Sequence, residues 1–461
     1  VTMIRQKFIL NKFRTFLIAL FICFVGVTFP ASGKELHEIP TVEGKFKYHV
    51  AEDWEDLYPI AKRNDLAIEH IMWANGMTGI KTQAGQKLLL PTRWIMPETR
   101  PRDGIILNLA ERGIYLFKDG KFKKFFPVAI GAPEKWMTPT GEFKIITKVK
   151  NPTWLPPEWA KEEKPVRAGP DNPLGDRWMG LDKPGYGIHA TNNPVSIGLA
   201  ASHGCIRMYP ELAQELFEEV YINMPVTIVY EPVKVGYDAT SKQILIQTFP
   251  DVYNKTAGIY KAAQEKLSQY GLLGLVDDKK LKLIVGKKRA IPEPILGSDI
   301  KVMINGKPLE LSFSPILKDS KIWTTIEILK PLKAVLQWNN QDKSVNIHLN
   351  NKKHTLKIKK IDKDQGSDYS SSEDVAYLWK GRTIIPASKV LKTLGVNFQW
   401  QSKPEKTLII YTPGHSRQQQ NGIEKAEKEI NKYPLPTEVP DDVPVKREPS
   451  KNKKFTPEED T

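Results

Sequence analysis

The stretch Ser202-His203-Gly204-Cys205-Ile206-Arg207-Met208, with Gly187-Ile188-His189-Ala190-Thr191 upstream, decides how the rest of this sequence is interpreted. A cysteine attacks a carbonyl carbon as its thiolate, and a histidine within hydrogen-bond distance takes the thiol proton. A glycine beside such a nucleophile allows unusual dihedrals and close backbone approach, and nearby N–H groups bind a developing oxyanion. The stretch therefore suggests cysteine-dependent acyl transfer, whereas the alternative is an inert buried cysteine.

Two histidines are candidates for the general base. His203 lies two residues before Cys205, so the two side chains would share a face if this segment were extended. His189 would approach Cys205 from a neighbouring strand. The residues alone leave both histidines open, and either can be a packed side chain with no role in chemistry.

Short apolar segments separated by Gly and Pro surround this stretch and predict a mainly β domain. Asp119-Gly120 is typical of a tight hairpin turn. A helix should begin near Pro210, because apolar side chains that follow recur on one helical face. The expected strands cover residues 105–109, 114–117, 122–130, 143–146 and 225–230.

Further motifs at residues 137–143, 151–154 and 169–177 extend the pattern. With them, residues 103–230 resemble the L,D-transpeptidase catalytic domain. The resemblance implies that Cys205 is the nucleophile and His189 the general base. It also implies that the backbone carbonyl of Ala190 orients His189. Ala190 stands where many members have glycine, and a main-chain role tolerates this change.

The same resemblance places His203, Gly204 and Arg207 around the substrate, with the amides of Gly204 and Cys205 forming an oxyanion hole. It implies a peptidoglycan tetrapeptide stem as substrate, a thioester intermediate, release of D-Ala and a new cross-link, without metal or cofactor. An L,D-carboxypeptidase, in which water resolves the thioester, and a non-catalytic wall-binding scaffold remain alternatives. Arg177 and Arg207 suit carboxylate binding, although either can form a structural salt bridge.

Residues 45–92 predict a small strand-helix-helix-strand module. The module resembles the LysM domain, which implies binding of glycans that contain N-acetylglucosamine, near residues 51–54 and 75–80. The candidate contacts are Asp53, Trp54, Asn75 and Gly76, and their alternative role is to shape turns. Deletion of residues 46–92 would then weaken wall retention and spare turnover of a small soluble stem.

The C-terminal half contains a connecting extension, residues 231–298, with a helix near residues 260–267. Residues 299–412 repeat a pattern, in which a segment ending in Trp338 or Trp400 is followed by a short strand. This α+β accessory module resembles the copper amine oxidase N-terminal domain. No copper is expected, because His348 and His354 lack the spacing of a ligand cluster and are interpreted as surface residues.

The two ends of the sequence predict export and a flexible tail. Basic residues precede an apolar run at 16–29 and a small-residue site at Ala31-Ser32-Gly33, so residues 1–33 are interpreted as a signal peptide. Of the two cysteines only Cys205 would remain, and an unpaired thiol in an exported protein suggests reactivity. Residues 413–461 have the composition of a disordered segment.

The net charge of +15 suggests an anionic partner. No basic segment carries a nucleic-acid motif, so anionic cell-wall polymers are the other candidate, and the alternative is that the charge serves solubility alone. The sequence thus predicts a secreted, wall-associated multidomain protein, and it does not indicate the oligomeric state.

Overall fold

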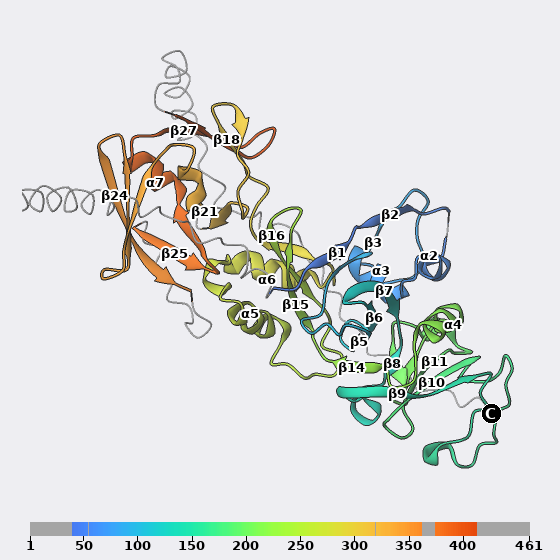
Figure 1. Ribbon diagram of the computed structural model, residues 1–461. Helices are drawn as coiled ribbons and strands as arrows, with labels where there is room; N and C mark the ends of the chain where they lie inside the picture. Colours follow the sequence, from blue (N-terminus) through green and yellow to red (C-terminus); the bar gives the residue numbers. More distant parts are fainter. Residues whose placement is uncertain (1–38, 54, 319, 362–373, 413–461) are drawn as a thin grey trace, which may run out of the picture.

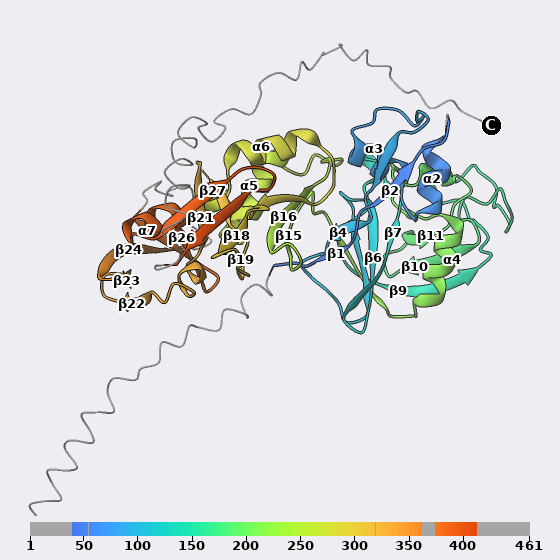
Figure 2. The same ribbon diagram turned by 90° about the horizontal axis from the view of Figure 1, so that it is seen from above.

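The computed structural model describes residues 39–53, 55–318, 320–361 and 374–412. An N-terminal module (residues 39–96) and a central domain (residues 103–230) lie together at one end of an elongated molecule (Figures 1 and 2). The extension follows in the middle, and the C-terminal module forms the other end. The expected signal peptide, Trp54 and the expected tail lie outside the described residues. Within these ranges, no helix has the length and apolarity needed to cross a bilayer.

The central domain is built on an eight-stranded sheet with the order β13-β11-β10-β9-β14-β5-β6-β7. Its neighbours are antiparallel except for β14 with β5 and β11 with β13, which are parallel. Two short strands, β8 and β12, form a separate parallel pair. The strands are β5 (Gly104–Asn108), β6 (Gly113–Lys118), β7 (Lys121–Pro127), β8 (Ile130–Gly131), β9 (Gly141–Lys150), β10 (Arg177–Leu181), β11 (Gly187–His189), β12 (Ala200–Ser202), β13 (Ile206–Arg207) and β14 (Pro225–Val229).

Helix α4 (Pro210–Glu219) covers this sheet and begins at the proline expected from the sequence. Leu212, Leu216 and Phe217 are buried on one face of the helix and join the core of the sheet. Asp119 and Gly120 both have positive φ in the turn between β6 and β7, as a two-residue hairpin turn requires. The helix and this hairpin are therefore confirmed, as is a mainly β architecture.

The N-terminal module follows the order β2 (Lys47–Val50), α2 (Leu57–Arg63), α3 (Ile68–Asn75) and β3 (Lys87–Leu90). Strands β2 and β3 pair antiparallel, and the helices bury their apolar faces against β3. The Asp56 carboxylate caps α2 by accepting from the Tyr58 amide. A second pair, β1 (Val42–Gly44) with β4 (Arg93–Ile95), brings the two ends of the module together.

This module shares buried contacts with the central domain and is not a freely tethered unit. Ala67 belongs to the core of the central domain, and a Cβ on Gly198 would come within 2.5 Å of it. His70 Nε2 lies 2.9 Å from the carbonyl oxygen of Glu111. Removal of residues 46–92 would expose these groups. The deletion would therefore disturb the central domain as well, and it cannot test wall retention separately from turnover.

A buried ion pair joins the extension to the central domain. Lys234, which is 2% exposed, lies 3.0 Å from a carboxylate oxygen of Glu111 and donates to the Tyr115 hydroxyl at 2.7 Å. Tyr115 in turn donates to the other Glu111 oxygen at 2.7 Å. Because each charged group has a partner, the cost of burying the pair is offset. Loss of either Lys234 or Glu111 would leave the other charge buried without an ionic partner.

We expect stability to decrease in mild acid because of His70. Burial lowers the pKa of His70 to about 4, below the usual value of 6.5. Between these two values the unfolded chain binds more protons than the folded chain, so the free energy of unfolding falls as pH decreases from 6.5 to 4. The loss is about 2–3 kcal/mol at pH 4.5. Thermal melts at pH 7 and 4.5 should show a smaller difference for His70→Gln than for the wild type. Equal differences would contradict this prediction.

The extension forms a three-stranded sheet of β15 (Val233–Asp238), β16 (Gln243–Thr248) and β17 (Glu293–Leu296), covered by α5 (Ile259–Gln269) and α6 (Asp278–Lys287). The helix expected near residues 260–267 is α5. Apolar side chains of this unit and of the C-terminal module form one continuous core, which includes Leu267, Phe313 and Trp379.

The C-terminal module contains a four-stranded and a seven-stranded sheet and the helix α7 (Ala387–Thr393). Its sequence repeat corresponds to two antiparallel hairpins, β22–β23 and β27–β28. The strands are β18 (Lys301–Ile304), β19 (Lys307–Pro308), β20 (Ile316–Lys318), β21 (Lys321–Thr325), β22 (Val335–Asn339), β23 (Ser344–Leu349), β24 (Lys352–Lys360), β25 (Val375–Trp379), β26 (Arg382–Pro386), β27 (Asn397–Gln401) and β28 (Thr407–Tyr411).

The interpretation of His354 as a surface residue is wrong. His354 is only 8% exposed and His348 is half-buried. In the β23–β24 ladder His354 pairs with Ile347 and His348 with Lys353. Neighbouring positions along a strand point to opposite faces, so the two imidazoles do not converge on one metal. Among the described residues there is no group of three or more metal-ligating side chains.

Candidate active site

His189 and Cys205 are brought together by the parallel pairing of β11 with β13. The register places Ile188 opposite Ile206 and His189 opposite Arg207. Cys205 immediately precedes β13, so it lies beside the strand that ends at His189. The positive charge of Arg207 acts on both the imidazole and the thiol. The structure therefore brings His189 close to Cys205 and Arg207, which follow it by 16 and 18 positions in the sequence.

The environment of His189 fixes which nitrogen can act as a base. Its ring is 4% exposed, and Nδ1 lies 2.5 Å from the carbonyl oxygen of Ala190. A carbonyl oxygen only accepts, so Nδ1 carries the hydrogen toward Ala190, and Nε2 is the nitrogen left to act as a base. The backbone of Leu174 makes a second contact with the ring. Trp178, the cross-strand partner on β10, stacks on the ring at 5.7 Å between centroids. Ala190 thus occupies the orienting position expected for it.

Burial and the nearby Arg207 charge lower the pKa of His189 to about 4. Burial also raises the pKa of the Cys205 thiol, and this effect outweighs an amide hydrogen bond from Gly187 and the charge of Arg207. Both groups are therefore neutral near pH 7. The resting pair is a thiol and an imidazole, not a thiolate and an imidazolium.

The half-buried thiol of Cys205 donates to the carbonyl oxygen of Gly185 at 3.3 Å. Within the described ranges, no hydrogen bond joins this thiol to the His189 ring. Catalytic hydrogen bonds often form only when substrate is bound. Rotation of the thiol from Gly185 toward His189 is the movement that activation would require.

A tight turn presents the nucleophile. The Ser202 hydroxyl accepts from the Gly204 amide at 3.1 Å and donates to the Cys205 carbonyl at 2.5 Å. Gly204 has a φ of +109°, and a Cβ there would lie 2.8 Å from the Tyr186 ring. Of the two amides expected in an oxyanion hole, the Gly204 amide is thus occupied by Ser202. For the Cys205 amide, the described chain provides no acceptor, and this amide remains available to an oxyanion.

His203 lies between two indole rings at the edge of this turn. It stacks on Trp159 at 3.8 Å and meets Trp136 edge-on at 4.8 Å between centroids. The segment from Ser202 to Cys205 is folded back on itself, so the extended geometry that would have placed His203 beside the thiol does not occur. His203 is therefore packed against indole rings, whereas His189 lies on the strand beside Cys205. Trp136 carries no motif that would have singled it out.

The two candidate arginines differ in their partners. Arg177 lies 2.8 Å from the Asp176 carboxylate and stacks over Phe217, so it has a structural role. Arg207 is half-buried, and its guanidinium has no ion pair or hydrogen bond to another described residue. Because a guanidinium suits bidentate carboxylate binding, Arg207 is the better candidate to bind an anionic substrate group.

The segment between β9 and β10 is held in shape by a buried amide. Asn172 is fully buried, and its Nδ2 donates to the carbonyl oxygens of Pro152, Val166 and Arg167. The 3₁₀ turn Glu158–Ala160 carries Trp159 to the ring of His203. One ordered segment therefore forms a wall beside the nucleophile turn.

The candidate glycan contacts of the N-terminal module have different environments. Asp53 is exposed in a turn, whereas the Asn75 side chain donates to Leu89 O at 2.9 Å and accepts from Leu89 N at 2.8 Å. Gly76 adopts a left-handed conformation as the C-cap of α3. The two loops do lie together, since the Leu57 amide donates to Ile80 O at 2.9 Å. Asn75 and Gly76 thus shape the module in this structure.

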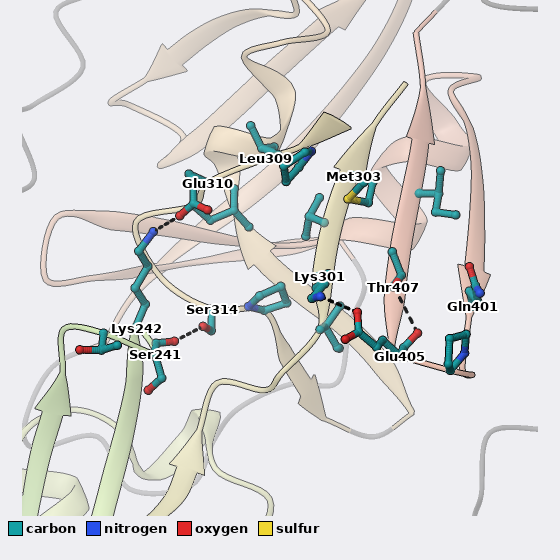
Figure 3. Close-up of a pocket in the computed structure, with 18 residues that line it drawn as sticks. Ser241, Lys242, Lys301, Met303, Leu309, Glu310, Ser314, Gln401, Glu405 and Thr407 are labelled. Atoms are coloured by element: carbon teal, nitrogen blue, oxygen red, sulfur yellow. Dashed lines mark hydrogen bonds and ion pairs between the residues drawn. The ribbon is translucent and has the colours of Figure 1, made fainter. Parts of the chain in front are cut away.

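A cavity of about 680 Å³ lies between the extension and the C-terminal module (Figure 3). Its charged side chains pair with one another, Lys242 with Glu310 and Lys301 with Glu405, each at 2.5 Å. Neither Cys205 nor His189 contributes to its lining. This cavity is therefore separate from the candidate active site.

A buried imidazole held by the Ala190 carbonyl, beside a cysteine on a tight turn, is typical of a cysteine-histidine site of the acyl-transfer type. The family model described as L,D-transpeptidase catalytic domain matches residues 102–228, and that described as copper amine oxidase N-terminal domain matches residues 303–411. The chain belongs to the L,D-transpeptidase family.

Two relatives illustrate this membership of the L,D-transpeptidase family. The probable L,D-transpeptidase YcfS of Escherichia coli is 32% identical over 217 residues, which cover 44% of this chain and 68% of that protein. The putative L,D-transpeptidase YkuD of Bacillus subtilis is 33% identical over 38% of this chain and 93% of its own length. Other relatives are covered less completely, such as 62% of the probable L,D-transpeptidase ErfK/SrfK of Salmonella typhimurium.

Among solved structures, the catalytic domain of the Enterococcus faecium L,D-transpeptidase is 27% identical. The match covers 28% of this chain and 96% of that chain, with a TM-score of 0.24.

Proposed function

We propose that this protein is a peptidoglycan L,D-transpeptidase that forms a thioester on Cys205 with the tetrapeptide stem. The observation that carries the proposal is the juxtaposition of Cys205 with a buried His189 whose Nδ1 is held by Ala190. That geometry leaves Nε2 unprotonated at neutral pH, which is the state a general base needs. Arg207 supplies a positive charge on the same site.

In the first half-reaction, the Cys205 thiol gives its proton to His189 Nε2 as the sulfur attacks the carbonyl of the diamino acid. Because burial disfavours charge on either group, the proton moves together with the attack and no stable ion pair accumulates. The Cys205 amide binds the oxyanion. The protonated His189 then donates to the amine of D-Ala, which leaves, and the thioester remains.

In the second half-reaction, the side-chain amine of another stem attacks the thioester carbonyl. His189 removes a proton from this amine and returns it to the sulfur as the thiol leaves. One amide is broken and one is formed, so the exchange requires no energy source beyond the original peptide bond. If water replaces the amine, the same steps describe an L,D-carboxypeptidase.

Mass spectrometry separates these outcomes. Purified residues 34–461 are incubated with disaccharide-tetrapeptide, alongside Cys205→Ala. A cross-linked dimer that has lost one D-Ala, and that is absent with the variant, supports the transpeptidase. Tripeptide and free D-Ala alone would indicate the carboxypeptidase. No product would leave a wall-binding scaffold as the function to pursue.

We expect Arg207 to contribute mainly to substrate binding. Arg207→Met should raise KM for the tetrapeptide by about 10–100-fold, because a charge-assisted hydrogen bond to a carboxylate contributes about 1.5–3 kcal/mol. Steady-state kinetics measure this effect. Arg177→Met is the matched control, since it loses an ion pair with Asp176 and should lower Tm while leaving KM unchanged. Equal KM values for Arg207→Met and the wild type would contradict the role.

We further propose that the N-terminal module is a LysM domain that holds the enzyme on its insoluble substrate. The pairing of its two loops near Leu57 and Ile80 supports this. The charge of +15 supports an additional attraction to anionic wall polymers. Export by the N-terminal leader and a wall location belong to the same proposal. In this arrangement, binding raises the local concentration of stems at Cys205.

Ile80 offers a test that leaves the shared core intact. Its side chain is 44% exposed beside the paired loops, so Ile80→Ser should lower the fraction retained on insoluble peptidoglycan about several-fold, given the usual worth of a buried apolar contact. Turnover of a soluble stem should not change. Leu283→Ser, at a similarly exposed position on α6, is the control. Undiminished retention of Ile80→Ser would contradict glycan binding at this surface.

A further inference from the structure

Tyr253 comes from the extension, outside residues 102–228 that match the catalytic-domain family model. It nevertheless belongs to the core of the central domain and is only 6% exposed. Its hydroxyl donates to the carbonyl oxygen of Gly131 at 2.7 Å and accepts from the amide of Thr138 at 3.2 Å. The extension therefore reaches into the domain that carries Cys205.

Residues 131–138, which Tyr253 contacts, also hold the nucleophile turn, residues 202–205. The Thr138 hydroxyl accepts from the Gly131 amide and donates to the Gly204 carbonyl, each at 2.9 Å. The hydroxyls of Tyr253 and Thr138 have one hydrogen each. Each therefore donates to one carbonyl oxygen and accepts from one amide. A connected path runs from Tyr253 through Thr138 to the peptide that joins Gly204 to Cys205.

Two more contacts tie residues 131–138 to the turn. The Ala132 amide donates to Ser202 O at 2.8 Å, and Trp136 meets His203 edge-on. A Cβ on Gly131 would lie 1.8 Å from the carbonyl oxygen of Trp136, so the segment is closed tightly on itself. A change at one end is therefore transmitted to the other, because this packing leaves no room for local adjustment.

The position of Tyr253 is itself fixed by its own loop. The Asp251 carboxylate accepts from the Tyr230 hydroxyl at 2.5 Å and from the amides of Lys255 and Thr256 at 2.9 and 2.8 Å. The Tyr230 hydroxyl accepts from the Tyr253 amide at 3.0 Å, and the two rings stack at 5.5 Å. Tyr253 is thus held before any substrate arrives.

We propose that Tyr253 is a positioning residue, which acts through Thr138 to orient the Gly204–Cys205 peptide and hence the Cys205 amide that binds the oxyanion. The inference rests on the proposed function, since it concerns the same acyl transfer. It assigns a role in the reaction to the extension, which carries no chemistry of its own.

The test compares two reactions of Cys205 in the full chain. Acylation by a carbapenem passes through a tetrahedral oxyanion, whereas alkylation by iodoacetamide does not. For Tyr253→Phe we expect acylation to slow about 10-fold, less than the loss of a whole oxyanion donor, while the pH profile and rate of alkylation stay unchanged. With tetrapeptide, kcat should fall and KM should not. Thr138→Val should behave in the same way, and Tyr260→Phe, on α5 of the extension, is the control.

Each outcome has one meaning. Slower acylation with unchanged alkylation supports the inference. Unchanged acylation, or an equal loss of both reactions, overturns it, because the second result reflects general disruption of the site. If the wild type is acylated but forms no cross-linked dimer or tripeptide, the proposed function fails while the comparison of acylation rates still decides the role of Tyr253.

Discussion

Cys205→Ala should abolish formation of the cross-linked dimer, the tripeptide and the carbapenem adduct. No other cysteine occurs among the described residues, and an alanine methyl group cannot form an acyl bond. Removal of a catalytic nucleophile usually lowers kcat by at least about 10³-fold. Cys205→Ser should be nearly as inactive, because a hydroxyl is harder to deprotonate by an imidazole with a pKa of about 4. Product analysis by mass spectrometry gives the residual rate.

The fold should survive this change. The thiol has only weak hydrogen bonds, one to Gly185 O and one from the Gly187 amide, and the turn is held by Ser202 and Thr138 through backbone atoms. Tm should therefore shift by no more than about 2 °C, as expected for loss of weak contacts. Ser196→Ala, a buried position in the same domain, is the control and should keep full activity. A Cys205→Ala protein that still released D-Ala would contradict the assignment of the nucleophile.

Much of this site follows from the sequence because its parts are local. The Gly204 turn, the carbonyl of Ala190 and the strand that ends at His189 involve residues near one another in the chain. The hairpin at Asp119-Gly120 and the helix from Pro210 follow from dihedral and periodicity preferences in the same way. Each of these features depends on a few residues that are close in the chain, so a short sequence pattern is enough to predict it.

Contacts between segments far apart in the chain do not follow from local sequence patterns. The bond from Tyr253 to Gly131 spans 122 positions, and that from Lys234 to Glu111 spans 123. A tyrosine in an apolar segment gives no sign of its partner, because its pattern is the same whether its hydroxyl bonds water or a buried carbonyl. The sequence of the extension therefore indicates only a connector, although Tyr253 of this segment belongs to the core of the central domain.

The choice between the two histidines shows the same limit in a short segment. Spacing alone allows His203 to share a face with Cys205, but only if the segment is extended. The Ser202 hydroxyl and the positive φ of Gly204 close this segment into a turn. Side-chain to backbone bonds of this kind compete with regular structure. These bonds remove the two-residue alternation of an extended segment, which His203 needs in order to lie beside the Cys205 thiol.

His189→Ala should lower kcat/KM by about 10²–10⁴-fold, the usual contribution of a positioned general base. In the wild type the imidazole must be unprotonated to accept the thiol proton. With a pKa of about 4, activity should rise through pH 4 and stay level through neutrality. In His189→Ala this acid limb should disappear. The residual activity should instead increase at alkaline pH, because burial raises the pKa of the Cys205 thiol.

His203→Gln is the matched control, since its ring lies between Trp136 and Trp159 and its loss should leave the acid limb in place. Arg207→Met provides a second check, because the positive charge of Arg207 helps to keep the pKa of His189 low. Its removal should move the acid limb toward higher pH. If the acid limb instead disappeared in His203→Gln and remained in His189→Ala, the proton would pass through His203. The turn seen here would then have to open during catalysis.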